Sequence, residues 1–131
     1  MQLTHFGHSC VLADFGHTTV LFDPGNFSHG FEGITGLSAI VITHQHPDHV
    51  DQERLPALLD GNPGAALYAD PQTTEQLSVP CHAVHVGDEL SVGELTLWAS
   101  DPVQLPWPII SDAQVLDAMA SSLCAAYLGS C

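Results

Sequence analysis

The sequence predicts a layered α/β domain. Short β-prone runs separated by turn residues occupy positions 2–22, which is typical of antiparallel strands joined by tight turns. Residues 39–43 then form a continuous, largely β-branched run of the kind expected of a strand that is buried on both faces. From there to residue 86, strand-like segments alternate with short helical segments, and this order favours helices packed against a sheet.

The N-terminal runs comprise residues 2–6, 9–15 and 17–22, and we expect them to form an antiparallel meander. The segment Asp23-Pro24-Gly25 ends the third run, because aspartate, proline and glycine favour turns. A loop rich in glycine and serine continues from there to Gly36. The first buried strand of the α/β region therefore begins after this loop.

The elements after that strand follow from local patterns. Residues 51–59 begin with acidic residues and hold leucines at helical spacing, so we expect a short helix that ends in the Gly/Pro-rich segment 60–64. The other expected elements are a strand at 66–69, a short helix at 71–77 with proline in its first turn, a strand at 81–86, a hairpin turn at Gly87-Asp88, and strands at 89–92 and 94–98 around Gly93.

The length of 131 residues fits one domain. The pattern changes after Ser100, where prolines interrupt an apolar stretch and an alanine-rich segment with helical periodicity follows. We therefore divide the chain into residues 1–100 and a divergent apolar, helical tail at 101–131.

The chain is strongly acidic because it lacks basic residues. Arg54 is the only lysine or arginine, against 15 aspartates and glutamates, and the net charge is −14 with neutral histidines. Such a surface repels phosphate backbones and anionic lipids, so we expect no nucleic-acid or membrane partner. The sequence holds no apolar run near the roughly 20 residues that span a bilayer and no signal-peptide pattern, which predicts a cytoplasmic protein. The four widely spaced cysteines favour reduced thiols, with Cys10 as a small buried hydrophobe.

A dense cluster of metal-ligand residue types follows the buried strand. Residues 44–49 read His-Gln-His-Pro-Asp-His and hold three imidazoles and one carboxylate. Residues two apart in an extended segment point the same way, so His44 and His46 can bind one ion, while the turn after the proline directs Asp48 and His49 towards a second. Imidazole and carboxylate suit zinc, with iron or manganese as alternatives.

The segment 43–49 resembles the metal-binding signature of the metallo-β-lactamase superfamily. Residues 5–10 (His-Phe-Gly-His-Ser-Cys) resemble the opening strand of its lactonase-like and phospholipase-like branches, and residues 21–25 (Leu-Phe-Asp-Pro-Gly) resemble the end of their next strand. These landmarks stand in the family's order, and the resemblance covers about residues 2–100. It implies an αββα sandwich with the metal site at the edge between two sheets, of which this chain would form the N-terminal αβ half.

The resemblance also implies a two-metal site, with His44 and His46 on the first ion and Asp48 and His49 on the second. In the family mechanism a metal-bound hydroxide attacks the substrate, and the aspartate at the position of Asp48 helps to orient or deprotonate that water. The implied function is the hydrolysis of a small ester or thioester, lactone, phosphodiester or amide. Zinc is the expected metal.

Two further residues are candidates for supporting roles. His8 matches the family's Gly-His landmark near the metal cleft, and it either contacts a ligand or the substrate there or is a hydrogen-bonded structural histidine. Asp23 is expected to accept a hydrogen bond from a ligand histidine, a role that also agrees with its place in a turn.

The complete family site uses three more ligands: a later histidine, a later bridging aspartate and a final histidine. No histidine follows His85. Gly87-Asp88 resembles the bridging pair only in residue type, because it fits a turn better. The chain is therefore interpreted as a truncated or frame-shifted version of a longer ancestor. The alternative is a divergent tail that folds over the sheet through five apolar positions: Val115, Leu116, Met119, Leu123 and Tyr127.

Three functions remain open on these grounds. The first is a metal-dependent hydrolase, and the second is a non-catalytic metal-binding remnant or half-domain that needs a second chain. The third is a β-rich interaction module in which the histidine loop is incidental. The missing half of the sandwich would leave an apolar sheet face exposed, which predicts a homo-oligomer formed through that face.

Overall fold

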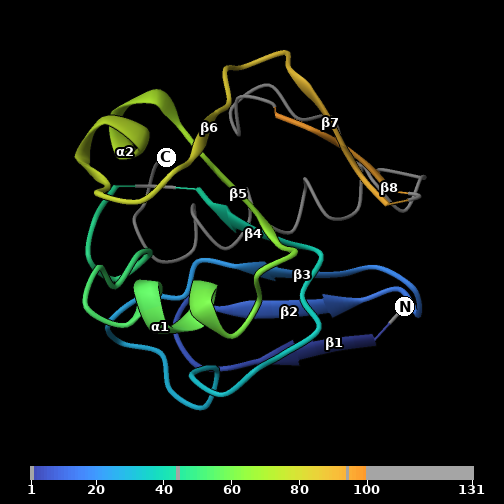
Figure 1. Cartoon of the computed structure of the whole chain (residues 1–131), viewed down its shortest axis with the longest axis vertical. Coiled ribbons are helices and arrows are strands. Elements are labelled where there is room, and N and C mark those ends of the chain that lie inside the picture. Colours follow the sequence, from blue (N-terminus) through green and yellow to red (C-terminus); the bar gives the residue numbers. More distant parts are fainter. Residues whose placement is uncertain (1, 44, 94, 100–131) are drawn as a thin grey trace.

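The structure, a computed structural model, describes residues 2–43, 45–93 and 95–99. Its main feature is a mixed sheet whose strand order follows the chain from β1 to β6 (Figure 1). The strands are β1 (Gln2–His5), β2 (Val11–Asp14), β3 (Thr19–Phe22), β4 (Ala39–Ile42), β5 (Ala66–Ala69) and β6 (His82–Ala83). Strands β1, β2 and β3 pair antiparallel, which confirms the expected meander, and β3, β4, β5 and β6 pair parallel.

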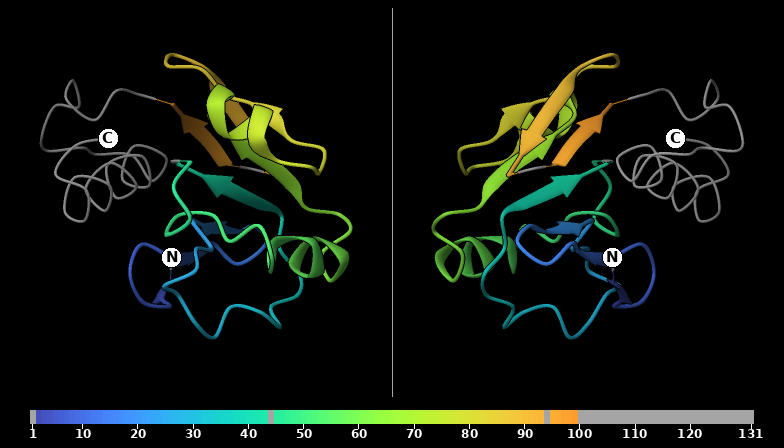
Figure 2. Two further views of the ribbon diagram at one scale, coloured as in Figure 1. Left: turned by 90° about the vertical axis from the view of Figure 1, so that its left-hand side faces the viewer. Right: turned by 90° about the vertical axis from the view of Figure 1, so that its right-hand side faces the viewer.

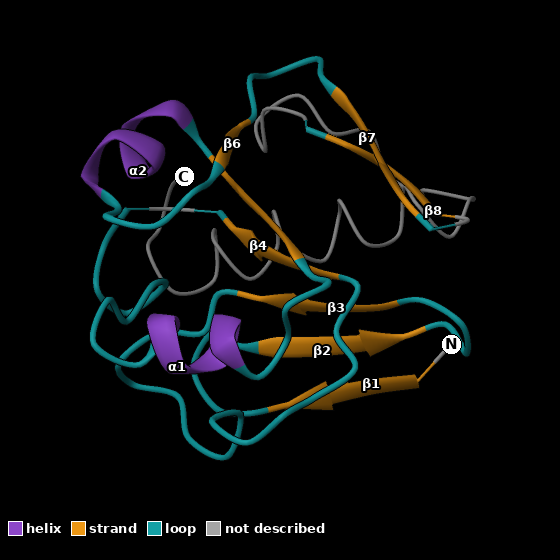
Figure 3. Ribbon diagram, viewed as in Figure 1, coloured by secondary structure: helices purple, strands orange, loops and turns teal. Residues whose placement is uncertain are grey.

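Short helices connect β4 to β5 and β5 to β6 (Figure 3). Helix α1 (Leu55–Asp60) lies between β4 and β5, and α2 (Pro71–Gln76) lies between β5 and β6. Helix α1 starts later than the sequence predicts, because the Asp51 side chain accepts hydrogen bonds from the amides of Glu53 and Arg54 (2.9 and 3.3 Å) and holds this segment in a turn.

The two faces of the sheet pack into separate clusters. On one face Ile40 lies with Leu58 of α1, and both side chains are almost completely buried. On the other face Val20 packs in one cluster with Val92 and Leu97 of a two-stranded hairpin. Figure 2 shows α1 and this hairpin on opposite sides of the sheet. Because successive side chains of a strand point to opposite faces, the apolar run of β4 supplies both clusters.

The hairpin forms a second sheet from β7 (Glu89–Val92) and β8 (Leu95–Trp98), paired antiparallel around Gly93. These strands agree with the sequence prediction. The prediction that Gly87-Asp88 forms a hairpin turn is wrong, because the strands on either side of it do not pair with each other. The chain does turn there, with Gly87 at φ +94° and the Asp88 amide donating to the His85 carbonyl (3.0 Å), but it passes from β6 in one sheet to β7 in the other.

The sheet face that we expected to be exposed is buried at several positions. Ala13, Val20 and Ala39 lie on it and have no exposed surface, and the hairpin residues Val92 and Leu97 belong to the same cluster. The hairpin therefore covers part of this face. The tail at 101–131, with the five positions proposed to cover the sheet, lies outside the described residues, and the boundary at residue 100 remains a prediction. None of the helices in residues 2–99 that the structure describes is long and apolar enough to cross a membrane.

Candidate functional site

The candidate site lies at one edge of the six-stranded sheet, where three chain segments meet. Strands β3 and β4 are parallel, so the residues that follow them leave the sheet at the same edge. Val11 at the start of β2 pairs with Phe22 at the end of β3, so the residues before β2 also reach this edge. The segments brought together are residues 6–10, residues 23–26, and residues 43 and 45–50.

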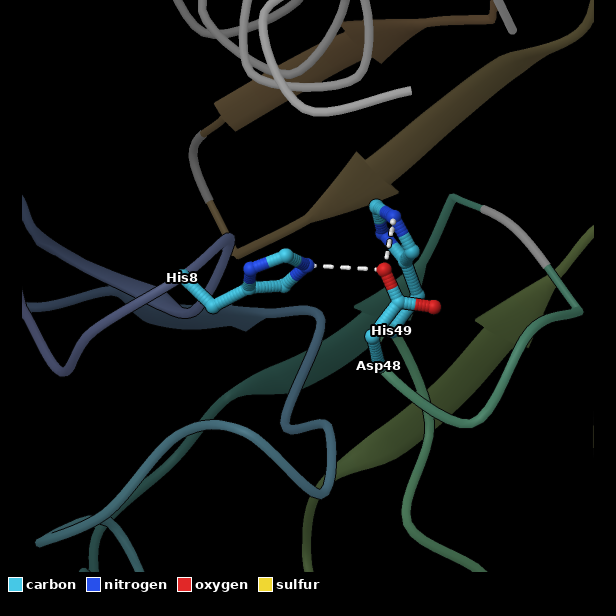
Figure 4. A group of neighbouring side chains, drawn as sticks. All are labelled: His8, Asp48 and His49. Carbon is cyan, nitrogen blue, oxygen red and sulfur yellow. Dashed lines mark hydrogen bonds and ion pairs between the residues drawn. The ribbon is translucent and has the colours of Figure 1, made fainter.

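Side chains of metal-ligand type gather at this edge. His8, Asp48 and His49 each place one potential ligand atom within 4.8 Å of the other two (Figure 4). Oδ2 of Asp48 lies 2.7 Å from Nε2 of His8 and 3.5 Å from Nε2 of His49. The side chains of His8 and Asp48 are 20% and 15% exposed, whereas that of His49 has no exposed surface. The group is therefore anchored in the interior and reaches solvent through His8 and Asp48.

The distances between the ligand atoms of this group indicate two kinds of contact. Zinc binds nitrogen and oxygen at about 2.0–2.2 Å in tetrahedral geometry, which places two ligand atoms of one ion roughly 3.3 Å apart. The distance of 3.5 Å between Asp48 Oδ2 and His49 Nε2 fits two ligands of one ion. The 2.7 Å between Asp48 and His8 is instead a hydrogen-bond distance. The distance between Asp48 and His49 is therefore compatible with a shared metal ion, and His8 contacts the same Asp48 carboxylate.

The orientation of His49 is fixed by a buried carboxylate. Nδ1 of His49 lies 2.7 Å from Oδ2 of Asp23, so this nitrogen carries the proton that it donates to the carboxylate. In the neutral ring, Nε2 then faces Asp48 with a lone pair. Burial lowers the pKa of His49, but the hydrogen bond and the charge of Asp23 outweigh that effect and the net pKa lies above its ordinary value. This is the hydrogen bond that the sequence predicts for Asp23; the role of His49 as a metal ligand remains a prediction.

Asp23 also ties the end of β3 to the end of β4. Its Oδ1 accepts a hydrogen bond from the Thr43 amide (2.7 Å) and its Oδ2 accepts one from the Thr43 hydroxyl (2.5 Å). The residue is almost completely buried and has φ +50°, a conformation that aspartate tolerates better than most residues. One carboxylate therefore sets both the conformation of the β4 end and the direction of His49.

His8 approaches from the turn between β1 and β2. It has φ +50° and follows Gly7 at φ +86°, so two successive left-handed residues direct the chain back toward β2. The His8 ring stands edge-on to the rings of Phe27 (centroids 5.5 Å apart) and His49 (5.9 Å). The functional and structural interpretations of His8 both agree with this geometry, since the side chain is hydrogen-bonded and also borders the exposed part of the group.

The charge of Asp48 is stabilised by its neighbours. Partial burial raises the pKa of the Asp48 carboxyl, but the hydrogen bond from His8 and the charge on His49 more than offset it, so the pKa lies below its usual value. The carboxylate is therefore ionised at neutral pH. An ionised carboxylate can bind a cation or accept a hydrogen bond from water.

The structure brings together some of the predicted ligands. Asp48 and His49 lie in the group of three, and His46 has an exposed side chain and is not part of that group. His44 lies outside the described residues, so its position as a ligand remains a prediction. Asp88 lies in the turn between the two sheets, where its Oδ2 accepts a hydrogen bond from the His85 amide (2.8 Å), as a turn residue does.

Sequence reasoning missed two hydroxyl groups that support the site. Ser9 Oγ lies 3.3 Å from Nδ1 of His49, and the Thr43 hydroxyl donates to Asp23. Both residues lie within sequence landmarks, Ser9 in residues 5–10 and Thr43 in residues 43–49, but the sequence assigns neither of them a role. Their contacts span many residues along the chain, so only the assembled fold shows which partner each one has.

A mixed sheet that gathers histidine and aspartate side chains at the ends of adjacent strands is an arrangement suited to binding a metal. The family model of the β-lactamase superfamily domain matches residues 2–118. The chain therefore belongs to the metallo-β-lactamase superfamily, as its sequence landmarks indicated.

Two known proteins are similar to this chain. It is 74% identical over 99 residues to "Protein Rv0786c" of Mycobacterium tuberculosis (strain ATCC 25618 / H37Rv), a match that covers 76% of this chain and 47% of that protein. The chain thus spans about half the length of this relative. Its fold is similar to the crystal structure named "Putative metal-dependent hydrolase from Parabacteroides distasonis ATCC 8503", with a TM-score of 0.58 and 19% identity over 67% of this chain and 39% of that one.

Proposed function

We propose that the protein is a metal-dependent hydrolase, or one half of such an enzyme. The observation that carries this proposal is the pairing of Asp48 with His49, whose Nε2 is directed at the Asp48 carboxylate by the hydrogen bond from Nδ1 to Asp23. Metal-bound histidines commonly donate their second ring nitrogen to a carboxylate in this way. The name of the similar solved structure points to the same class of reaction.

The ligand set that we propose follows the family pattern. His44 and His46 would bind one ion, and Asp48 and His49 the other, with His8 in contact with Asp48 through their hydrogen bond. Zinc suits these donors best, and iron or manganese accept the same ligands. When bound, such ions lower the pKa of water towards about 7 and polarise the substrate oxygen.

The side chains of this chain contribute positioning and proton transfer. Asp48 is the proposed catalytic residue, because its ionised carboxylate lies at the exposed side of the group and can orient a water molecule or accept its proton. His8 holds this carboxylate in place through the hydrogen bond from its Nε2. Asp23 and Ser9 hold the ring of His49. The Nε2 atom of this buried histidine, a potential metal ligand, therefore keeps one orientation towards Asp48.

The proposed substrate is a small ester or thioester, lactone, phosphodiester or amide, and we propose no nucleic-acid partner for so acidic a chain. The αββα sandwich of the family would place a second αβ layer against the face that β7 and β8 partly cover. Residues 1–100 then form one half of that sandwich. The second candidate function is a metal-binding half-domain completed by another chain, and it is favoured by the small group of potential ligands that the described residues bring together, which is His8, Asp48 and His49.

Hydrolysis assays of metal-loaded protein test the proposal. The protein is incubated with zinc and assayed against a lactone, a phosphodiester and an aryl ester. Turnover that Asp48→Ala abolishes, and that the control Asp60→Ala at an exposed acidic position retains, would support the hydrolase. Zinc binding without turnover would favour the half-domain, and the absence of both would contradict the proposed function.

A further inference from the structure

We propose that Arg54 is a positioning residue for the metal site: it holds the backbone of Gly25 against the backbone of Asp48 and so sets where Asp48 and His49 lie. This proposal rests on the proposed function, because it concerns the same ligands. It assigns a role to the only lysine or arginine in the sequence.

Each nitrogen of the Arg54 guanidinium has its own hydrogen-bond partner. Nε donates to Oδ2 of Asp51 (2.6 Å), Nη1 donates to Oε1 of Glu32, and Nη2 donates to the carbonyl oxygen of Gly25 (2.7 Å). The guanidinium carbon lies 4.5 Å from the centroid of the Phe31 ring, which supports the planar group from one face. Arg54 therefore joins the loop after β3 to the segment that follows the histidine motif.

Gly25, at one end of this connection, lies in direct contact with the backbone of the histidine motif. A Cβ atom at Gly25 would lie 1.9 Å from the carbonyl oxygen of Asp48, so only glycine allows this approach. Hydrogen bonds run on both sides of the contact, from the Asn26 amide to the Pro47 carbonyl (2.8 Å) and from the Asp51 amide to the Pro24 carbonyl (2.9 Å). The backbone of residues 47–51 therefore runs alongside the backbone of residues 24–26.

The geometry of arginine suits this connection. Its planar fork presents donors in several fixed directions, whereas the ammonium group of lysine is a compact point charge. A lysine at position 54 can keep an ion pair with Asp51 or Glu32 but cannot also hold the Gly25 carbonyl with the same geometry. Arg54→Lys therefore removes the positioning contact while keeping the charge.

Charge and position have opposite effects on metal affinity, which makes the proposal testable. Removing a positive charge near a cation site strengthens the attraction for a metal, so an electrostatic role alone predicts tighter zinc binding in Arg54→Gln and unchanged binding in Arg54→Lys. The positioning role predicts weaker binding in both variants. The expected loss is about tenfold, comparable to the loss of a group that orients a metal ligand.

The experiment measures zinc affinity by competition with a chelating dye, under conditions where circular dichroism shows each variant folded. The variants are Arg54→Lys, Arg54→Gln and Gly25→Ala. Gly64→Ala is the control, because a Cβ at Gly64 meets no atom within 4 Å. About tenfold weaker binding in both Arg54 variants, with wild-type binding in Gly64→Ala, supports the proposal. Wild-type or tighter binding in the folded Arg54 variants overturns it.

A metal-free readout separates this proposal from the proposed function. Hydrogen–deuterium exchange of the peptide that contains residues 47–51 should be faster in Arg54→Lys, since the amides of His49 and Val50 donate to His46 and that of Asp51 donates to Pro24. Faster exchange in a protein that binds no zinc would contradict the proposed function and leave the positioning role supported. Unchanged exchange together with unchanged affinity overturns the positioning role.

Discussion

Replacing Asp23 with asparagine removes the carboxylate that orients His49 while changing the side-chain shape very little. The carboxylate accepts three hydrogen bonds, from Nδ1 of His49, from the Thr43 amide and from the Thr43 hydroxyl. An amide has one oxygen and one NH₂ group, so it cannot accept all three. If its oxygen stays with the Thr43 amide, its NH₂ group faces Nδ1 of His49.

The consequence for His49 is a change of tautomer. Nδ1 can accept a hydrogen bond from the NH₂ group only if the ring proton moves to Nε2, and a protonated Nε2 cannot donate a lone pair to a metal. If the amide flips instead, its NH₂ group meets the N–H of Thr43, and two donors face each other. Both arrangements are unfavourable. Loss of a hydrogen bond that orients a metal-binding histidine lowers metal affinity about 10- to 100-fold, which corresponds to roughly 1.4–2.7 kcal/mol.

The same substitution should destabilise the metal-free protein. Hydrogen bonds to a buried charged group contribute about 1.5–3 kcal/mol each, so we expect a loss of at least about 1.5 kcal/mol in the free energy of unfolding. Urea denaturation measures this loss, and dye competition measures zinc affinity on folded protein. Asp60→Asn is the matched control, because it makes the same charge change at an exposed position. A folded Asp23→Asn variant with wild-type zinc affinity would refute the reasoning.

Three further predictions concern the fold. Leu58→Ala should lower the free energy of unfolding by about 2–5 kcal/mol in urea denaturation, because Leu58 is 1% exposed and joins α1 to the sheet; a loss well below 1 kcal/mol would contradict that packing. Cys10 has no exposed surface and burial raises its pKa to about 12, so peptide mapping should find it protected from iodoacetamide in native protein, whereas Cys81 reacts; equal modification would argue against this core. Light scattering should find a homo-oligomer if the sheet face is only partly covered, and a strictly monomeric species would indicate a fully covered face.

Much of the sheet could be predicted because local signals are strong there. The strand at 66–69 and the hairpin strand at 89–92 were predicted with the observed bounds. Strand β6 is shorter than the predicted 81–86, because its register with β5 includes only His82 and Ala83 before the chain turns towards the second sheet. Strand propensity gives no information about where a neighbouring strand ends, so the extent of pairing was not predictable.

The site was predictable in part for a similar reason. The clustering of Asp48 and His49 follows from their adjacency. The hydrogen bond between Asp23 and His49 agrees with the proposed role of His49, because ligand histidines commonly donate to such an acceptor. The contact of His8 with Asp48 joins residues 40 positions apart, and the approach of Gly25 to Asp48 depends on the path of two loops. Such contacts are set by tertiary packing, and no local pattern indicates them.

The metal content of the purified protein tests the central claim most directly. Mass spectrometry of the metals in protein prepared without added ions should find stoichiometric zinc, iron or manganese in the wild type. The double variant Asp48→Ala plus His49→Ala should lose it, while Asp60→Ala should keep it. A wild-type protein without bound metal, or a double variant that is folded and keeps the wild-type metal content, would contradict the assignment of this site as a metal centre.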